Sequence, residues 1–154
     1  MKHHPGWLAA GLLIFVVLAC NLSKNKNTST SNDQLTNRPA NAEVYVDQIQ
    51  MAKDDAGQVG DSTTSFNPSE HTVHVVITLN KAKAGTLLRA VWLAADVEGM
   101  AKNRELKAVD YTTNASDQKI PGYLTWSQDW PKGTYKVEVY INGVLDKTLS
   151  YTVE

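Results

Sequence analysis

Apolar residues recur at every second position through most of the chain after residue 43. In residues 71–80 they are Val73, Val75, Ile77 and Leu79, and residues 134–141 repeat the pattern with Tyr135, Val137, Val139 and Ile141. A period of two is typical of a β-strand with one buried face, whereas an amphipathic helix has a period of 3.6. No stretch shows a convincing helical stripe. The sequence therefore predicts an all-β domain.

The dipeptide Asn142-Gly143 lies between two alternating runs, and the second run places Leu149, Tyr151 and Val153 on one face. Asn-Gly suits a two-residue type I′ turn, in which both residues need positive φ. The pattern predicts a β-hairpin here. Further strands are expected at residues 44–51, 86–95, 106–112 and 122–127, between turn sequences at 54–57, 67–68, 83–85 and 131–133. About seven short strands favour an antiparallel sandwich of two sheets.

The run Gly133-Thr134-Tyr135-Lys136-Val137 resembles the Gly-x-Tyr-x-Cys sequence at the tyrosine corner of immunoglobulin-like domains. The resemblance implies that the Tyr135 hydroxyl bonds to backbone upstream and that Val137 replaces the cysteine. Trp92 resembles the buried tryptophan of the third strand in the same family. An immunoglobulin-like fold is expected for residues 43–154. Since the sole cysteine is Cys20, an intrachain disulfide is impossible, and the core alone must hold the fold.

The N-terminus has the features of an export signal. Lys2 precedes thirteen consecutive apolar or small residues, 7–19. As a helix they would cover about 20 Å, short of the roughly 30 Å hydrocarbon core of a membrane, so the hydrophobic region of a signal peptide is favoured. An ordinary secretory signal or an uncleaved anchor is the alternative.

The segment Val17-Leu18-Ala19-Cys20 resembles the lipobox of bacterial lipoproteins. The resemblance implies a diacylglyceryl thioether on Cys20, cleavage after residue 19 and an acylated new N-terminus. Several acyl chains, at about 0.8 kcal/mol per buried CH₂, anchor a protein durably. We therefore expect a lipid-anchored protein outside the cytoplasm, in the bacterial cell envelope. Asn21 in place of aspartate favours the outer membrane if the bacterium is Gram-negative.

Residues 21–42 contain no aromatic residue and only two large aliphatic ones. Such a composition cannot bury enough apolar surface to offset the entropy of ordering the chain. The expected organisation is a signal peptide at 1–19, a lipidated cysteine with a disordered tether at 20–42, and the sandwich domain at 43–154.

Recognisable catalytic chemistry is lacking. Acidic and basic residues nearly balance, at 16 and 15, and no basic run is present, which argues against nucleic-acid binding. His71 and His74 are three apart and fall on opposite faces of a strand, so a shared metal is not expected, and His74 is interpreted as solvent-facing. No nucleophile elbow or phosphate-binding loop occurs. We expect a non-enzymatic protein whose only attached group is the lipid on Cys20.

An acidic loop offers one alternative metal site. Asp54, Asp55 and Asp61 flank a glycine-containing loop and could gather around calcium. Their spacing is not that of an EF-hand, and a solvated turn is the expected structure.

Two groups of residues are candidates for a binding surface. Leu87, Val91 and Leu93 form an apolar outer face on a strand that is also apolar on its other face. That face is either covered by a loop or exposed for a partner. The second group is aromatic: Tyr123, Trp130 and Tyr140. Trp130, before a Pro-Lys-Gly turn, is the best candidate for an exposed ring, although it could instead pack over the end of the sandwich.

These features favour an interaction module that binds an envelope protein. The alternative is a carbohydrate-binding module that presents its aromatic rings to glycan or peptidoglycan.

The anchor is directly testable. Replacing Cys20 with Ser removes the thiol that accepts the lipid, so the variant should leave the membrane fraction and lose labelling by a fatty-acid probe. Unchanged labelling would show that the lipobox interpretation is wrong.

Overall fold

The structure is a computed structural model that describes residues 38–154. In this part of the chain there are nine strands and no helix. The strands are β1 (Val46–Asp55), β2 (Gln58–Ser62), β3 (Ser65–Phe66), β4 (Thr72–Leu79), β5 (Leu87–Val97), β6 (Arg104–Thr112), β7 (Lys119–Thr125), β8 (Gly133–Ile141) and β9 (Val144–Val153). No helix of the described residues is long and apolar enough to cross a membrane.

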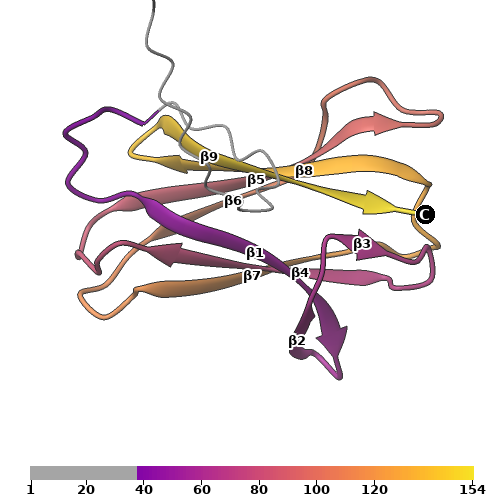
Figure 1. The fold of residues 1–154 in the computed structure, drawn as a ribbon, viewed down its shortest axis with the longest axis horizontal. Coiled ribbons are helices and arrows are strands. Elements are labelled where there is room, and N and C mark those ends of the chain that lie inside the picture. Colours follow the sequence, from indigo (N-terminus) through magenta and orange to yellow (C-terminus); the bar gives the residue numbers. More distant parts are fainter. Residues whose placement is uncertain (1–37) are drawn as a thin grey trace, which may run out of the picture. The chain divides into compact units, whose positions relative to one another are not determined.

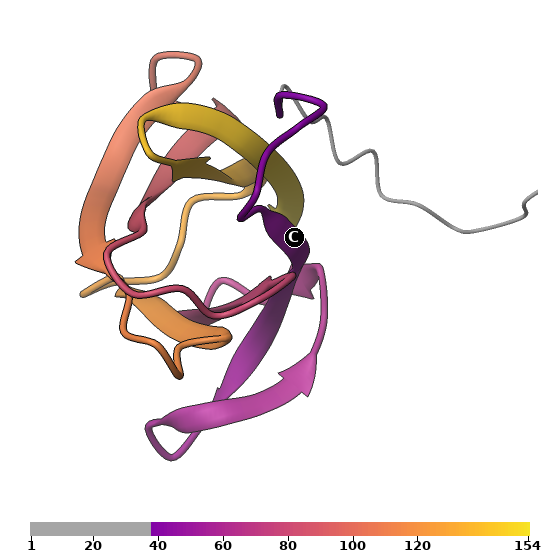
Figure 2. The same ribbon diagram turned by 90° about the vertical axis from the view of Figure 1, so that its left-hand side faces the viewer.

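The strands form two stacked sheets, which confirms the predicted sandwich (Figure 1). One sheet has the order β2-β1-β4-β7, and the other has the order β3-β9-β8-β5-β6. Every pairing is antiparallel except β3 with β9, which is parallel. The β1–β2 hairpin projects away from the two layers, as both views show (Figures 1 and 2). The short β3 and the terminal β9 complete one edge of the larger sheet.

The seven strands expected from the alternation are all present, with ends shifted by a few residues. β2 and β3 were not predicted. β2 is a polar run whose five residues are exposed or half-buried, so it carries no apolar alternation. β3 has two residues, of which only Phe66 is buried, and a strand that short shows no period at all.

The predicted turn at the β8–β9 hairpin is confirmed. Asn142 and Gly143 have φ of 50° and 82°, and they connect the paired residues Ile141 and Val144. Both values are positive, as a type I′ turn requires.

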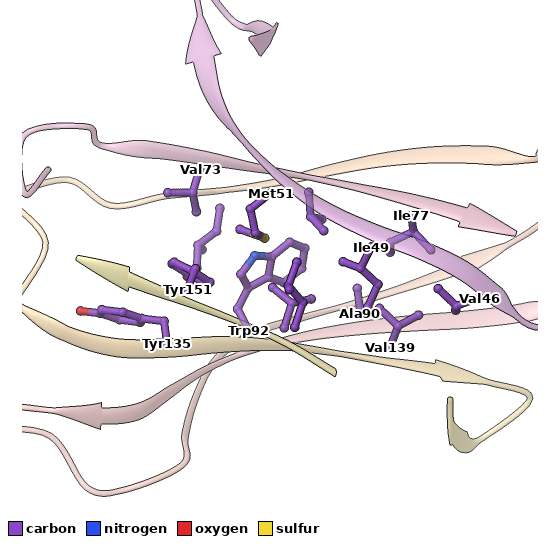
Figure 3. Packing of buried hydrophobic residues seen from close by; sticks show 14 of the residues in the cluster. Val46, Ile49, Met51, Val73, Ile77, Ala90, Trp92, Tyr135, Val139 and Tyr151 are labelled. Carbon is purple, nitrogen blue, oxygen red and sulfur yellow. The ribbon is translucent and has the colours of Figure 1, made fainter. Parts of the chain in front are cut away.

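Trp92 lies at the centre of the core, between the two sheets (Figure 3). Its side chain is 1% exposed, and Ile49 and Met51 face it from the smaller sheet. At one end of the core the rings form a continuous series: Trp126, Trp130, Tyr135, Tyr151 and Phe66, with neighbouring centroids 5.2 to 5.6 Å apart. Aromatic contacts at these distances add to the burial energy of each ring.

The predicted tyrosine corner is present. The Tyr135 hydroxyl donates a 2.6 Å hydrogen bond to the Pro131 carbonyl, and burial raises the pKa of this tyrosine to about 12. The turn between the two residues needs glycine at position 133. A Cβ there would lie 2.5 Å from the Asp96 carbonyl oxygen, and its φ is +148°. The corner thereby fixes the chain to β5 as it enters β8.

The predictions for residues 1–37, including the signal peptide and Cys20, lie outside the described residues. The last part of the expected tether, residues 38–42, does contact the domain. The Arg38 guanidinium lies 4.0 Å from the centroid of the Tyr45 ring, and its Nε is 3.7 Å from the buried Asp146 carboxylate. The same carboxylate accepts the Val46 amide at 2.7 Å. The contacts of the domain therefore extend to Arg38, before the expected boundary at residue 43.

Tyr135→Phe tests the tyrosine corner. The ring stays buried while the Pro131 carbonyl loses its partner, so unfolding in urea should become easier by about 1 kcal/mol. Tyr111→Phe is the matched control, because its hydroxyl donates to the Asp117 carboxylate at the surface. If both variants lose the same free energy of unfolding, the hydrogen bond at the corner stabilises the fold no more than a surface hydrogen bond does.

Candidate functional site

Trp130 is buried, with 2% of its surface exposed, so it is not the exposed aromatic ring for which it was a candidate. The ring stacks on Trp126 at 5.2 Å and meets the edge of Tyr135 at 5.5 Å. It packs over the end of the sandwich, which was the other interpretation of this residue.

The second candidate surface, of Leu87, Val91 and Leu93, is also not an exposed face. Val91 and Leu93 are 5% and 9% exposed, and Leu87 alone is open, at 58%. Their neighbours on β8 are Glu138 and Lys136, which pair at 2.7 Å. The long side chains of such a pair cover apolar surface with their stems. A partner does not find an apolar patch here.

The remaining candidates belong to different sheets. Tyr123 lies on β7, in the smaller sheet, and is 57% exposed. Tyr140 lies on β8, in the larger sheet, and its hydroxyl donates to the Glu138 carboxylate at 2.7 Å. That hydrogen bond raises the pKa of Tyr140. The predicted residues therefore do not form one surface, and only Tyr123 adjoins a cavity.

That cavity is a groove of about 500 Å³ between β6 and β7. These are the outer strands of the two sheets on the same side of the sandwich, and they do not pair with each other. Buried inner-face residues of β4 and β5 form the floor of the groove. We call this cavity the β6–β7 groove; its lining residues are Val75, Ile77, Leu88, Ala90, Trp92, Lys107, Val109, Tyr111, Asp117, Lys119, Ile120, Pro121, Gly122 and Tyr123.

Gly122 lets β7 pack closely on the floor of the groove. A Cβ at this position would lie 3.2 Å from Val75 Cγ1 and 3.4 Å from Trp92 Cη2, both tight contacts. A larger side chain would push against the buried indole. The Trp92 Nε1 atom has no hydrogen-bond partner among the described residues. The groove therefore reaches the same tryptophan that holds the two sheets together.

Polar contacts cross the groove at two places. Lys107 on β6 donates from Nζ to the Tyr123 carbonyl at 3.2 Å, and its Nζ lies 5.1 Å from the centroid of that ring. Tyr111 donates to the Asp117 carboxylate at 2.7 Å, which lowers the pKa of Asp117 and raises that of Tyr111. The first link joins a side chain to the main chain and the second joins two side chains, and both lie at the exposed rim. A ligand can displace contacts that are open to water in this way.

The sequence did not identify the β6 wall of the groove. Val109 and Tyr111 share a face with Lys107, and they are 39% and 38% exposed. Their alternation predicts a half-buried strand. It does not show that the other sheet leaves the inner face of this strand partly uncovered. The only sequence feature that could have indicated the groove was a lysine next to two apolar residues on that inner face.

His74 is 6% exposed, so its interpretation as a solvent-facing residue is wrong. Its ring nitrogen Nε2 lies 2.7 Å from Asp54 Oδ1, because β1 pairs with β4 and Asp54 lies two residues beyond Ala52, the residue opposite His74. The hydrogen bond with His74 lowers the pKa of Asp54, and the Gly57 amide adds to this effect. His71 is exposed and contacts Asp129 at 3.0 Å.

The alternative calcium site is not formed. Within residues 38–154, no three histidine, cysteine, aspartate or glutamate side chains are grouped closely enough to hold a metal ion. Asp54, Asp55 and Asp61 are exposed and flank the β1–β2 turn, as a solvated loop would. Asp54 is instead held by the histidine.

Comparison with known proteins supports the fold. No protein-family description and no curated protein matches the sequence. An immunoglobulin-like protein from Pseudomonas aeruginosa aligns with a TM-score of 0.52 and 16% identity, over 75% of this chain and 100% of that one. The fold is immunoglobulin-like. The buried Trp92 and the corner at Tyr135 are the features of this fold that the sequence had indicated.

Two larger enzymes contain a similar region. One is an alkylpurine DNA glycosylase from Pseudomonas fluorescens, solved with DNA that contains an abasic-site analogue. Its TM-score is 0.47 at 16% identity, and the alignment covers 73% of this chain and 31% of the glycosylase. The other is a β-glucosidase from Bifidobacterium adolescentis, with a TM-score of 0.40 at 19% identity and an alignment that covers 71% of this chain and 17% of the glucosidase. This chain spans less than a third of either enzyme, and these likenesses carry no argument about activity.

The His74–Asp54 contact should make the stability depend on pH. Because the pKa of Asp54 is lowered in the folded state, its carboxylate stabilises the fold above the ordinary pKa, and the contribution is lost as pH falls through the lowered pKa. Between about pH 5 and 3, the free energy of unfolding measured in urea should therefore fall less steeply with decreasing pH for Asp54→Asn than for the unsubstituted protein.

His74→Asn supplies the second arm of a double-mutant cycle. In the His74→Asn background, Asp54→Asn should change the pH dependence much less. An Asp54→Asn effect of the same size in both backgrounds would contradict the assignment to this hydrogen bond.

Proposed function

We propose that this protein is a lipid-anchored component of the bacterial cell envelope whose immunoglobulin-like domain binds an envelope protein through the β6–β7 groove. The observation that carries the binding part is the groove itself. It is concave, it is lined mostly by apolar residues, and its volume of about 500 Å³ is that of a ligand site. The anchor part is supported by the resemblance of residues 17–20 to a lipobox.

Apolar exposure concentrates at this groove. Of the six large apolar residues that are exposed in the described part of the chain, three line it: Val109, Tyr111 and Tyr123. A binding surface typically combines such residues with a few polar groups that set orientation. Lys107, Lys119 and Asp117 supply those groups at the rim. We expect binding rather than catalysis. The groove is mostly apolar, and the described residues bring no nucleophile and base together in it and form no metal-binding cluster.

A glycan or peptidoglycan ligand is the second candidate, and the exposed ring of Tyr123 favours it. Sugar rings stack on flat aromatic faces with hydroxyl groups bonded to nearby polar side chains. Two features favour a protein ligand instead. The Lys107 ammonium already lies over the Tyr123 ring, and the groove below it is apolar rather than polar.

Site-specific photocrosslinking in intact cells tests the proposal. A photoreactive residue at position 109 should give one recurrent protein adduct in the envelope, because Val109 forms a wall of the groove. Position 59 is the matched control, since Val59 is exposed to a similar degree, 43% against 39%, but lies on β2. The adduct should weaken when Tyr123→Ala trims the rim.

Equal crosslinking from both positions would contradict a partner at the groove. Retention of the purified protein on insoluble peptidoglycan, lost on Tyr123→Ala, would instead favour the glycan. The Cys20→Ser variant tests the anchor separately from the groove. Loss of the adduct in this variant would show that the lipid anchor brings the domain to its partner. An adduct that remains would show that the groove binds its partner without the anchor.

A further inference from the structure

Strand β6 forms a free edge of the larger sheet. Within the described residues it pairs with β5 alone. Just beyond its end, the Thr113 carbonyl accepts the Gly85 amide at 2.8 Å and the Thr113 amide donates to the Thr86 carbonyl at 3.0 Å, just before β5 begins. In an antiparallel ladder the backbone groups of successive residues point alternately to the two sides. By this alternation, the edge presents the unpaired amides and carbonyls of Ala108, Asp110 and Thr112.

The facing edge, on β7, is blocked. The Tyr123 carbonyl accepts a hydrogen bond from Lys107 and so points away from β4. Two residues earlier, the backbone of Pro121 must point the same way, and proline has no amide hydrogen to offer. Proline and lysine are the residues that natural proteins use to protect an edge strand. Only one side of the groove can therefore extend its sheet.

We propose that the β6–β7 groove binds an extended segment of the partner protein as an added strand, paired with β6 through Ala108, Asp110 and Thr112. This inference rests on the proposed function and specifies the kind of partner. The residues of the segment that lie opposite Val109 and Tyr111 point to the same face as these two, into the groove. The segment therefore carries apolar side chains at alternate positions, and these pack over Leu88, Ala90 and Trp92.

The dimensions of the edge fit a short segment. Residues 108–112 of an extended strand span about 14 Å, which is the length of a partner segment of roughly five residues. Strand addition of this kind draws its affinity from main-chain hydrogen bonds and its specificity from alternate side chains in pockets. The Lys107 contact to Tyr123 is the one polar link that the segment displaces from the middle of the groove.

The charge at the rim adds to the description of the partner. Neither Lys107 nor Lys119 forms an ion pair with a described residue, whereas Asp110 is paired with Arg89 at 3.0 Å. Both lysines flank the groove. A segment that displaces the Lys107 amine frees this charge for a new partner. Lys107 shares the inner face of β6 with Val109 and Tyr111, so the favoured segment carries aspartate or glutamate at the inward position opposite Lys107 and apolar residues at the inward positions opposite the other two.

A phage-displayed library of random nonapeptides tests the proposal on the full-length protein in mild detergent. Enriched peptides should alternate apolar residues, and they should slow hydrogen exchange at Ala108, Asp110 and Thr112. Ala108→Pro removes one outward amide, so the same peptides should bind this variant at least about ten-fold more weakly. Ala108→Val keeps the amide and is the matched control, with unchanged affinity expected.

N-methylated peptides and a Val109→Asp variant distinguish strand addition from other ways of binding in the groove. Peptides N-methylated at the amides that face β6 should lose binding to the unsubstituted protein, which holds even if Ala108→Pro fails to fold. If the peptides bind Ala108→Pro normally but fail on Val109→Asp, the groove is a binding site and strand addition is wrong. If neither substitution weakens binding, or no peptide is enriched, both this inference and the role of the groove are overturned.

Discussion

The fold depends on the packing of Trp92 between two sheets that no disulfide joins. The chain has one cysteine, at position 20, before the described domain. Burying a tryptophan removes 150–250 Å² from water, which at about 25 cal/mol per Å² is worth roughly 4 to 6 kcal/mol. A disulfide contributes about 2 to 4 kcal/mol. The indole, together with the aromatic series that ends at Phe66, can therefore replace a covalent link between the sheets.

The same tryptophan explains why the β6–β7 side can stay open. The two sheets meet closely along β1 and β9 and along the aromatic end, but β6 and β7 are not joined. Gly122 lets β7 pack closely over Val75 and Trp92, so the ring is buried although β6 and β7 do not pair. A side chain at position 122 would push β7 away from the indole. The groove thus lies above a closed core, and a partner that covers it buries the exposed wall residues Val109 and Tyr111.

The features carried by local pattern were predictable from the sequence. The alternation identified seven strands, Asn142-Gly143 identified a hairpin turn, and the motif around Tyr135 identified a corner that the structure shows as a 2.6 Å hydrogen bond. Each of these depends on residues close together in the chain. The sandwich architecture followed because strands with one apolar face have few ways to bury it.

Exposure on the outer faces was not predictable, because it depends on residues distant in sequence. His74 is covered through Asp54, twenty positions earlier, and Trp130 through Trp126 and Tyr135. The pattern of a strand assigns a side chain to a face and leaves open what lies over that face. The groove escaped prediction for the same reason, since it exists only where the sheet order brings β6 and β7 to one side.

The two edges of the groove show how one arrangement can prevent aggregation and still permit binding. An unprotected edge strand pairs with any extended chain, and natural domains suppress this with proline, lysine and charge. Here Pro121 blocks β7 permanently, whereas β6 is shielded only by a lysine contact between exposed groups. Because this contact lies open to water, a segment with matching apolar side chains can displace it, while a random chain gains too little burial to do so. The selectivity of this edge then comes from the groove behind it. A partner must bury enough apolar surface in the groove to offset the loss of the Lys107 contact.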